Sequence, residues 1–183
     1  MTDPRHPRRS LISALPLVLF TGLALAAPPV PVDRVDLSRY MGRWYEIALI
    51  PNFFQRRCVA DTSAEYALRE GGLVSVTNRC RTKSGDMDQA EGVARVVDPA
   101  TNARLEVSFV SLLGLRLFWG DYWILGLGED YDYALVGTPS RRYGWVLARD
   151  PEVSEEQLAA WLRALAEQGY DPKDFVRSPG RVD

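Results

Sequence analysis

Apolar and polar residues alternate along most of the chain after residue 42. In residues 59–69, Thr62, Ala64 and Tyr66 fall on one face, and mainly charged or small polar residues fall on the other. A glycine pair at residues 71–72 turns this segment back into a second alternating one, which is the pattern of a β-hairpin. The same period of two predicts eight strands, at residues 42–50, 59–69, 73–80, 89–97, 104–109, 122–127, 132–138 and 143–149.

Evenly spaced short strands joined by turns predict an all-β fold, an eight-stranded antiparallel up-and-down β-barrel in which no edge strand stays unpaired. The last three strands are apolar on both faces, so their outer face needs a cover. A C-terminal α-helix at residues 154–168 fits this place, because Ser154 and Gln157 form a capping box and apolar residues follow with helical period. Residues 175–177 can add one more short strand.

The first residues of the chain have a different pattern. Three arginines before residue 10 precede an apolar run, which ends in an Ala-x-Ala sequence at residues 24–26. This order is typical of a secretory signal peptide, predicted at residues 1–27; residues 28–41 then form a leader to the barrel domain, residues 42–183. An uncleaved anchor is the alternative, and Arg8-Arg9 leaves twin-arginine and general export both open. We expect an exported, periplasmic protein.

The only histidine, His6, lies within this predicted signal peptide. After cleavage no imidazole is left, which excludes Ser-His-Asp triads, Cys-His pairs, histidine-ligated haem and ordinary zinc sites. The removed segment has three arginines and one aspartate, so the net charge changes from −2 to −4. A mildly acidic chain has no electrostatic reason to bind nucleic acid. The sequence therefore predicts no catalytic residue, no metal and no cofactor.

Residues from the two ends of the barrel domain are expected to meet. In an eight-stranded meander the first and last strands pair on closure, so the start of one lies beside the end of the other. Gly42 and Trp44 open the first strand and Arg149 ends the last. The Arg149 guanidinium can then stack on the Trp44 indole and shut that end. The loops after odd-numbered strands lie at the opposite end, where we expect the mouth.

Three stretches resemble the signatures of the lipocalin family. Residues 42–47, GRWYEI, are similar to the first signature, G-x-W; residues 129–136 are similar to the second, with Glu129 in place of a threonine; and residues 143–149 resemble the third, which ends in the packing arginine. The resemblance points to the bacterial outer-membrane lipocalins, related to apolipoprotein D. It implies carriage of fatty acids or lysophospholipids. No cysteine follows the cleavage pattern, so anchoring through an acylated N-terminal cysteine is not expected.

Two cysteines are expected at the mouth. Cys58 begins the second strand and Cys80 ends the third, so both lie at one end of the same hairpin. In a secreted chain this placement predicts a disulfide, with two buried free thiols or a nucleophilic cysteine as the alternatives.

Small residues on one face of the fourth strand, Ala90, Gly92 and Ala94, indicate a barrel that is not filled on that side. Apolar and aromatic side chains of other strands are expected to line the space, and two polar ones are candidates to contact a head group. The predicted ligand-binding residues are Glu46, Tyr66, Asn78, Val107, Phe109, Tyr122 and Trp145. Each of them can equally be plain core.

Two loops at the expected mouth are apolar: the first contains Phe53 and Phe54, and the fifth spans Leu112 to Trp119. They either fold over the cavity as a plug or contact a membrane surface or a partner protein. The favoured function is therefore non-catalytic carriage of a small lipophilic ligand. The alternatives are a lipocalin-type enzyme that uses Glu46 as a buried carboxylate and an interaction module that uses the apolar rim; the oligomeric state stays open.

Overall fold

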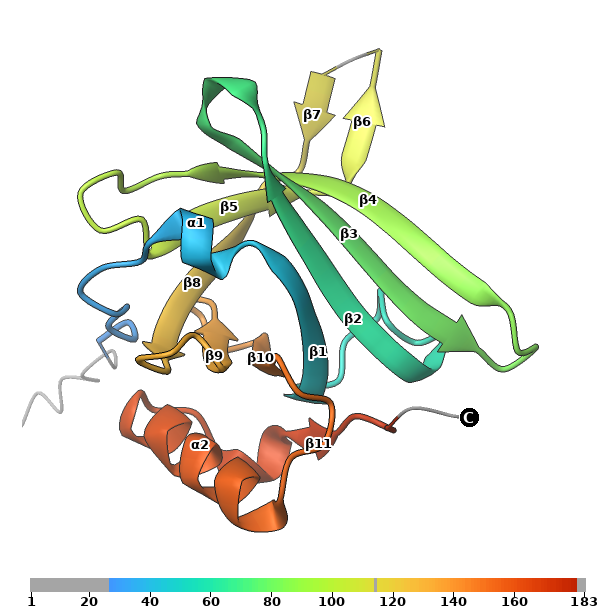
Figure 1. The fold of residues 1–183 in the computed structure, drawn as a ribbon, viewed down its shortest axis with the longest axis vertical. Helices are drawn as coiled ribbons and strands as arrows, with labels where there is room; N and C mark the ends of the chain where they lie inside the picture. Colours follow the sequence, from blue (N-terminus) through green and yellow to red (C-terminus); the bar gives the residue numbers. More distant parts are fainter. Residues whose placement is uncertain (1–26, 114, 181–183) are drawn as a thin grey trace, which may run out of the picture.

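Eight antiparallel strands close on themselves into a barrel (Figure 1). This computed structural model describes residues 27–113 and 115–180. The barrel strands are β1 (Gly42–Leu49), β2 (Cys58–Leu68), β3 (Leu73–Thr82), β4 (Met87–Val96), β5 (Arg104–Ser108), β8 (Gly120–Leu127), β9 (Tyr133–Gly137) and β10 (Gly144–Ala148). Each pairs with the next, and β10 pairs with β1 to complete the ring. The predicted up-and-down barrel is confirmed.

The sequence predicts no strand in the fifth loop. This loop contains two short strands, β6 (Val110–Leu112) and β7 (Leu115–Leu117), which pair with each other and form a separate two-stranded ribbon. Figure 1 shows this ribbon standing away from the barrel. The prediction missed it because each strand has only three residues, two apolar residues around one polar residue, and this is too short to give a readable period.

The leader, residues 28–41, is part of the fold. Its backbone donates from Val32 to the carbonyl of Ile124 and from Val35 to that of Thr101. A one-turn helix, α1 (Leu37–Tyr40), then begins after Asp36, whose side chain accepts two backbone N–H groups. The leader therefore crosses one end of the barrel before β1 begins (Figure 1).

Helix α2 (Glu155–Glu167) covers the outer face of the barrel (Figure 1), as the pattern predicts. Ser154 and Gln157 form the predicted capping box. Leu158 and Leu165 are buried among outward side chains of β1, β8, β9 and β10, and Trp161 stacks on Tyr133 with ring centroids 4.8 Å apart. The apolar outer faces of the last strands therefore form a second core beside the inner one.

The end of the described chain returns to β1. A short 3-10 helix follows α2 (Pro172–Asp174). Another lies earlier in the chain, between β2 and β3 (Glu70–Gly72). Strand β11 (Val176–Arg177) then pairs with Ala48 and Leu49 of β1. The predicted signal peptide lies, apart from Ala27, outside the described residues. No helix in the described part of the chain has the length and apolar character needed to cross a membrane.

Candidate functional site

One end of the barrel is shut by the predicted contact between Trp44 and Arg149. The guanidinium carbon lies 3.8 Å from the centroid of the indole ring, and Trp44 is fully buried. The guanidinium also donates to the carbonyls of Met41 at 2.8 Å and Arg43 at 2.7 Å. At Gly42, where φ is +92°, a side chain would meet this guanidinium at 3.4 Å. These contacts hold leader, first strand and last strand together at the closed end.

On β3 and β4, inward side chains become more exposed with distance from the closed end, except for the disulfide-bonded Cys80, which is 4% exposed. On β3, Val74 and Val76 are 1% and 3% exposed, whereas Asn78, the next inward residue, is half-buried. On β4, Ala94 is buried and Ala90 is exposed. The inside of the barrel is therefore packed at the closed end and open to solvent at the opposite end, which is the mouth.

The predicted lining residues divide into two groups. Tyr66, Val107, Tyr122 and Trp145 pack with the inner core, and all but Tyr66 keep some exposure. Asn78 shares their face, and its amide makes no hydrogen bond to the residues that the structure describes.

Phe109 fills part of the space that the small residues of β4 leave. A side chain at Gly92 would lie 2.8 Å from the Phe109 ring, so the ring rests directly on the glycine. Phe109 itself remains 39% exposed. The space beside the small inward residues of β4 is therefore only partly open, and a ligand at the mouth would meet the Phe109 ring.

Three tyrosine hydroxyls form a chain inside the barrel. The Tyr122 hydroxyl lies 2.8 Å from that of Tyr40 and 2.9 Å from that of Tyr66. Burial raises the pKa of Tyr66 to about 12 and raises the pKa of the other two phenols well above their ordinary range, so all three keep their protons. Three hydroxyls joined by two hydrogen bonds leave one O–H without an acceptor in the chain.

Sequence reasoning identified two of these tyrosines and missed Tyr40, which lies in the leader. The signal was its position directly before the G-x-W stretch. A residue that close to Trp44 has to lie at the closed end once the leader crosses it.

The predicted polar contact Glu46 is engaged by the protein itself. One carboxylate oxygen accepts from Nε2 of Gln55 at 2.6 Å, and the other accepts from Oγ of Ser178 at 2.7 Å. Burial raises the pKa of this carboxyl, against the opposite effect of the two hydrogen bonds. Glu46 therefore links the first loop and the C-terminal segment to the barrel and does not project freely into the cavity.

The first loop folds over one side of the mouth. Gln55, which the sequence did not single out, also accepts from Nε1 of Trp145 at 3.1 Å. The Phe54 ring lies 6.4 Å from that of Trp145 and 5.6 Å from that of Tyr143. This loop thus forms a partial cover, although Phe53 and Phe54 remain more than half exposed.

The β6–β7 ribbon exposes apolar side chains to solvent. Leu113 is 96% exposed and Phe118 is 81% exposed. The base of the ribbon is fixed, because the buried Ser108 hydroxyl lies 2.6 Å from the carbonyl of Leu117 and Arg95 lies over the Trp119 ring at 4.2 Å. A plug formed by this fifth loop is therefore not what the structure contains.

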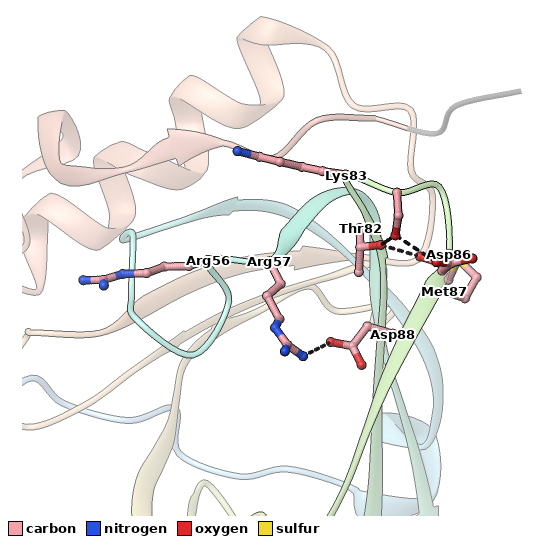
Figure 2. A pocket seen from close by; sticks show the side chains of 8 residues that line it. Arg56, Arg57, Thr82, Lys83, Asp86, Met87 and Asp88 are labelled. Atoms are coloured by element: carbon pink, nitrogen blue, oxygen red, sulfur yellow. Dashed lines mark hydrogen bonds and ion pairs between the residues drawn. The ribbon is translucent and has the colours of Figure 1, made fainter.

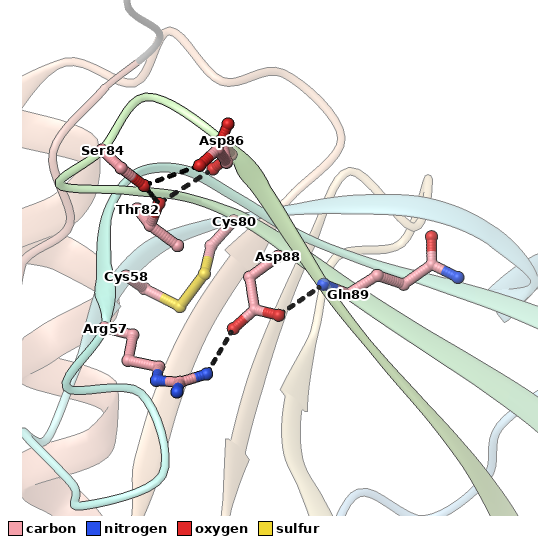
Figure 3. A network of polar contacts seen from close by, with 8 residues as sticks. All are labelled: Arg57, Cys58, Cys80, Thr82, Ser84, Asp86, Asp88 and Gln89. Carbon is pink, nitrogen blue, oxygen red and sulfur yellow. Dashed lines mark hydrogen bonds and ion pairs between the residues drawn. A yellow bond between two sulfur atoms is a disulfide. The ribbon is translucent and has the colours of Figure 1, made fainter.

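The predicted disulfide between Cys58 and Cys80 is present at the mouth (Figure 3). It joins the starting residue of β2 to the third residue from the end of β3 across 22 positions of sequence. Beside it, Arg57 of the first loop pairs with Asp88 of β4 at 3.8 Å. Among the described residues, no three Asp, Glu, Cys or His side chains gather where they could hold a metal ion.

A closed eight-stranded barrel, an outer helix and a tryptophan–arginine closed end define a small β-barrel binding protein. The family model described as a lipocalin-like domain matches residues 35–180. The chain belongs to the lipocalin family.

Its relatives include bacterial, plant and animal lipocalins. The chain is 35% identical over 179 residues to outer membrane lipoprotein Blc of Escherichia coli (strain K12), covering 91% of this chain and 98% of the relative. It is 38% identical over 151 residues to temperature-induced lipocalin-1 of Arabidopsis thaliana, covering 81% of each. It is 36% identical over 154 residues to apolipoprotein D of Rattus norvegicus, covering 79% and 76%. The predicted subgroup is thereby confirmed.

Solved structures show the same fold at lower identity. Insecticyanin from the tobacco hornworm Manduca sexta superposes with a TM-score of 0.66 at 23% identity, covering 84% of this chain and 85% of that one. Apocrustacyanin C2 gives a TM-score of 0.62 at 16% identity, covering 80% of each chain. The barrel is therefore shared well beyond the relatives found by sequence.

Proposed function

We propose that this protein binds and carries a small lipophilic ligand in the mouth half of its barrel. The observation that carries the proposal is the gradient of exposure along the inner face. At the closed end the apolar side chains are packed, and toward the mouth Trp145 is half-buried while Ala90 and Phe109 are exposed. Exposed apolar surface inside a concave site is what an apolar ligand covers.

The proposed ligand is elongated, with one acyl chain and one polar end, such as a fatty acid or a lysophospholipid. The inner face is mainly apolar and aromatic, and few polar groups interrupt it, namely Asn78 and the tyrosine hydroxyls. One chain suits a barrel of this size, because eight strands enclose room for a single small ligand.

The proposed place of action is the bacterial cell envelope, after export from the cytoplasm with the signal peptide. Three observations support it: the basic, apolar and small-residue order of residues 1–27, the disulfide, and relatives that are named outer membrane lipoproteins. Disulfides persist in oxidising compartments such as the periplasm. Both cysteines of the sequence are joined to each other, so the proposal includes no acylated cysteine.

The proposed carriage is non-catalytic. The carboxyl that a catalytic alternative would use, Glu46, already accepts hydrogen bonds from Gln55 and Ser178 on its two oxygens. A general base needs an oxygen directed at the proton that it removes. Glu46 has the character of a structural link, and shape and apolar contact remain as the means of holding a ligand.

A blocked mouth tests the carriage proposal. Ala90 is an exposed inward residue of β4, and Gln89, its neighbour in sequence, is an exposed outward one. Titration with oleic acid and lysophosphatidylcholine should give a dissociation constant about tenfold weaker for Ala90→Trp and within about twofold of wild type for Gln89→Trp. Native mass spectrometry of the protein from its own host should show the bound ligand. A barrel that is empty there and binds neither lipid in solution contradicts the proposal.

A second proposed property is contact of the β6–β7 ribbon with a membrane surface, favoured by the exposure of Leu113 and Phe118. A two-stranded ribbon that exposes apolar side chains to water is stabilised when those side chains enter a lipid interface. Leu113→Ser/Phe118→Ser should lower partitioning onto phospholipid vesicles. The matched control, Leu68→Ser/Leu73→Ser, changes exposed apolar residues at the turn between β2 and β3 and should leave partitioning unchanged. Equal partitioning of wild type and the ribbon variant contradicts the membrane contact.

A further inference from the structure

The inner face of the mouth half offers a negatively charged ligand group no positive partner among the described residues. Strand arginines lie on the outer face, where Arg79 pairs with Glu65 at 2.6 Å and Arg95 pairs with Glu106 at 2.7 Å. The carboxyl nearest the interior is Glu46, which repels an anion when ionised. An anionic amphiphile in this barrel therefore keeps its charged end outside the apolar space, at the rim.

A depression of about 490 Å³ lies at that rim, between the first loop and the turn that joins β3 to β4 (Figure 2). Both segments follow odd-numbered strands and so lie at the mouth end of the barrel. The lining residues are Arg56, Arg57, Thr82, Lys83, Ser84, Asp86, Met87 and Asp88.

Two of the three cations in this depression have no carboxylate partner within the described chain. Arg57 is paired with Asp88, and Figure 2 shows its side chain turned toward that carboxylate. Arg56 and Lys83 make no ion pair with the described residues, and Figure 2 shows both side chains extended away from Asp86 and Asp88. The remaining carboxylate, Asp86, accepts from the Ser84 hydroxyl at 2.8 Å, and its carbonyl accepts from the Thr82 hydroxyl. With three cations and two carboxylates, the depression has a net charge of +1, and two of its cations have no ion-pair partner among the described residues.

The disulfide fixes the two segments that carry these cations. Cys58 is two residues after Arg56, and Cys80 is three residues before Lys83. Figure 3 shows the bond between the start of β2, directly after the first loop, and β3, beside the Arg57–Asp88 pair. The backbone distance between the two cation-bearing segments is therefore constrained covalently, which reduces the entropy lost when both cations bind one group.

We propose that Arg56 and Lys83 bind the anionic group, a phosphate or carboxylate, of the amphiphile whose chain lies in the barrel. The inference rests on the proposed carriage function and adds to it the orientation of the ligand: chain inside, charged end at the disulfide-linked rim. Arginine and lysine side chains both bind such oxyanions through charge-assisted hydrogen bonds.

The test compares two lipids with the same oleoyl chain, lysophosphatidic acid and monooleoylglycerol. Only the first carries a phosphate. Arg56→Gln/Lys83→Gln should weaken lysophosphatidic acid binding about fivefold to tenfold and change monooleoylglycerol binding by less than about twofold. Raising the salt concentration should weaken lysophosphatidic acid binding to wild type more than to this variant, because screening acts on the charges that the variant lacks.

The matched control is Arg163→Gln/Lys173→Gln, which makes the same change of charge on exposed residues at the helix and the turn after it. It should leave both affinities unchanged, which separates the rim site from the net charge of the protein.

Each contrary outcome has one meaning. Equal lysophosphatidic acid affinity in wild type and the rim variant overturns the rim site while monooleoylglycerol binding upholds the carriage proposal. Failure of wild type to bind either lipid overturns the carriage proposal and the rim site with it. Glycerol phosphate that binds wild type as tightly as lysophosphatidic acid also overturns the inference, because the site then recognises free phosphate and not the end of a barrel ligand.

Discussion

The two ends of this barrel are built from the same eight strands and have opposite character. At the closed end Trp44 is fully buried and the Arg149 guanidinium is held by backbone carbonyls. At the mouth inward residues are accessible, and a disulfide and a folded loop supply the order that packing does not. The difference teaches that position along a strand, more than the inward or outward face alone, separates residues that stabilise the protein from residues free to bind.

The largest loss of stability is expected from a substitution at the closed end. Trp44→Ala removes the buried indole and its hydrogen bond to the carbonyl of Tyr40, and should lower the free energy of unfolding by about 3–5 kcal/mol. Trp145→Ala at the half-buried mouth should cost about half as much and weaken lipid binding. Urea unfolding and lipid titration of both variants measure the contrast. Equal loss of stability in the two variants contradicts the division between the ends.

The next largest effect concerns the disulfide at the mouth. Cys58→Ser/Cys80→Ser frees a loop of 22 residues and should lower the free energy of unfolding by about 3 kcal/mol on the chain-entropy account. Reduction of the wild-type protein should give a loss of similar size, which controls for the serine side chains. A double variant as stable as the oxidised wild type would show that other contacts already order the mouth.

A smaller effect is expected at Glu46, between the two ends. Burial raises the pKa of its carboxyl above the ordinary value of 4.5, so the folded state takes up the proton more readily than the unfolded state. This contribution to stability is fully present below the unfolded pKa and is lost as the pH rises through the folded pKa. Glu46→Gln has no such titration, so wild type should gain stability relative to the variant as the pH falls.

Denaturant unfolding of both proteins at pH values from about 4 to about 8 measures that difference. The glutamine keeps the shape of the side chain and can accept from Gln55 and donate to Ser178. A difference in unfolding free energy that stays constant over this range contradicts the assigned burial of the carboxyl.

The smallest effect on stability is expected in the β6–β7 ribbon. Leu113→Ser/Phe118→Ser changes side chains that are 96% and 81% exposed, so the free energy of unfolding should change by less than about 0.5 kcal/mol. A thermal unfolding curve that matches wild type checks this and shows that loss of vesicle binding in the same variant has no folding cause. A loss above about 1 kcal/mol would mean that the ribbon packs on the barrel.

The barrel strands and the outer helix could be predicted because their signals are local. Alternation with period two gave strand bounds within about two residues in most cases, and Ser154 with Gln157 gave the start of the helix. The contact between Trp44 and Arg149 could also be predicted, although the two residues are far apart in sequence, because the order of the strands determines which strand ends meet.

What could not be predicted depends on contacts between segments far apart in sequence. The Tyr40 hydroxyl meets Tyr122 across 82 residues, and Gln55 meets Trp145 across 90. No period marks Tyr40 or Gln55, and the position of Tyr40 before the G-x-W stretch indicates its end of the barrel but not its partner, because the leader and the first loop take their conformations from the barrel on which they pack. The contact between the Phe109 ring and Gly92 was missed for the same reason, because it depends on the register between β4 and β5.

The closure of β1 on β10 also has a consequence for the order of folding. The Arg149 guanidinium binds the carbonyl of Arg43 across 106 residues, so this contact forms only after nearly the whole domain has been made. Until β10 arrives, the earlier strands form at most an open sheet whose first and last members are unpaired. Such edges pair readily with other chains. The last barrel strand therefore both completes the fold and ends the period in which the nascent protein is prone to aggregate.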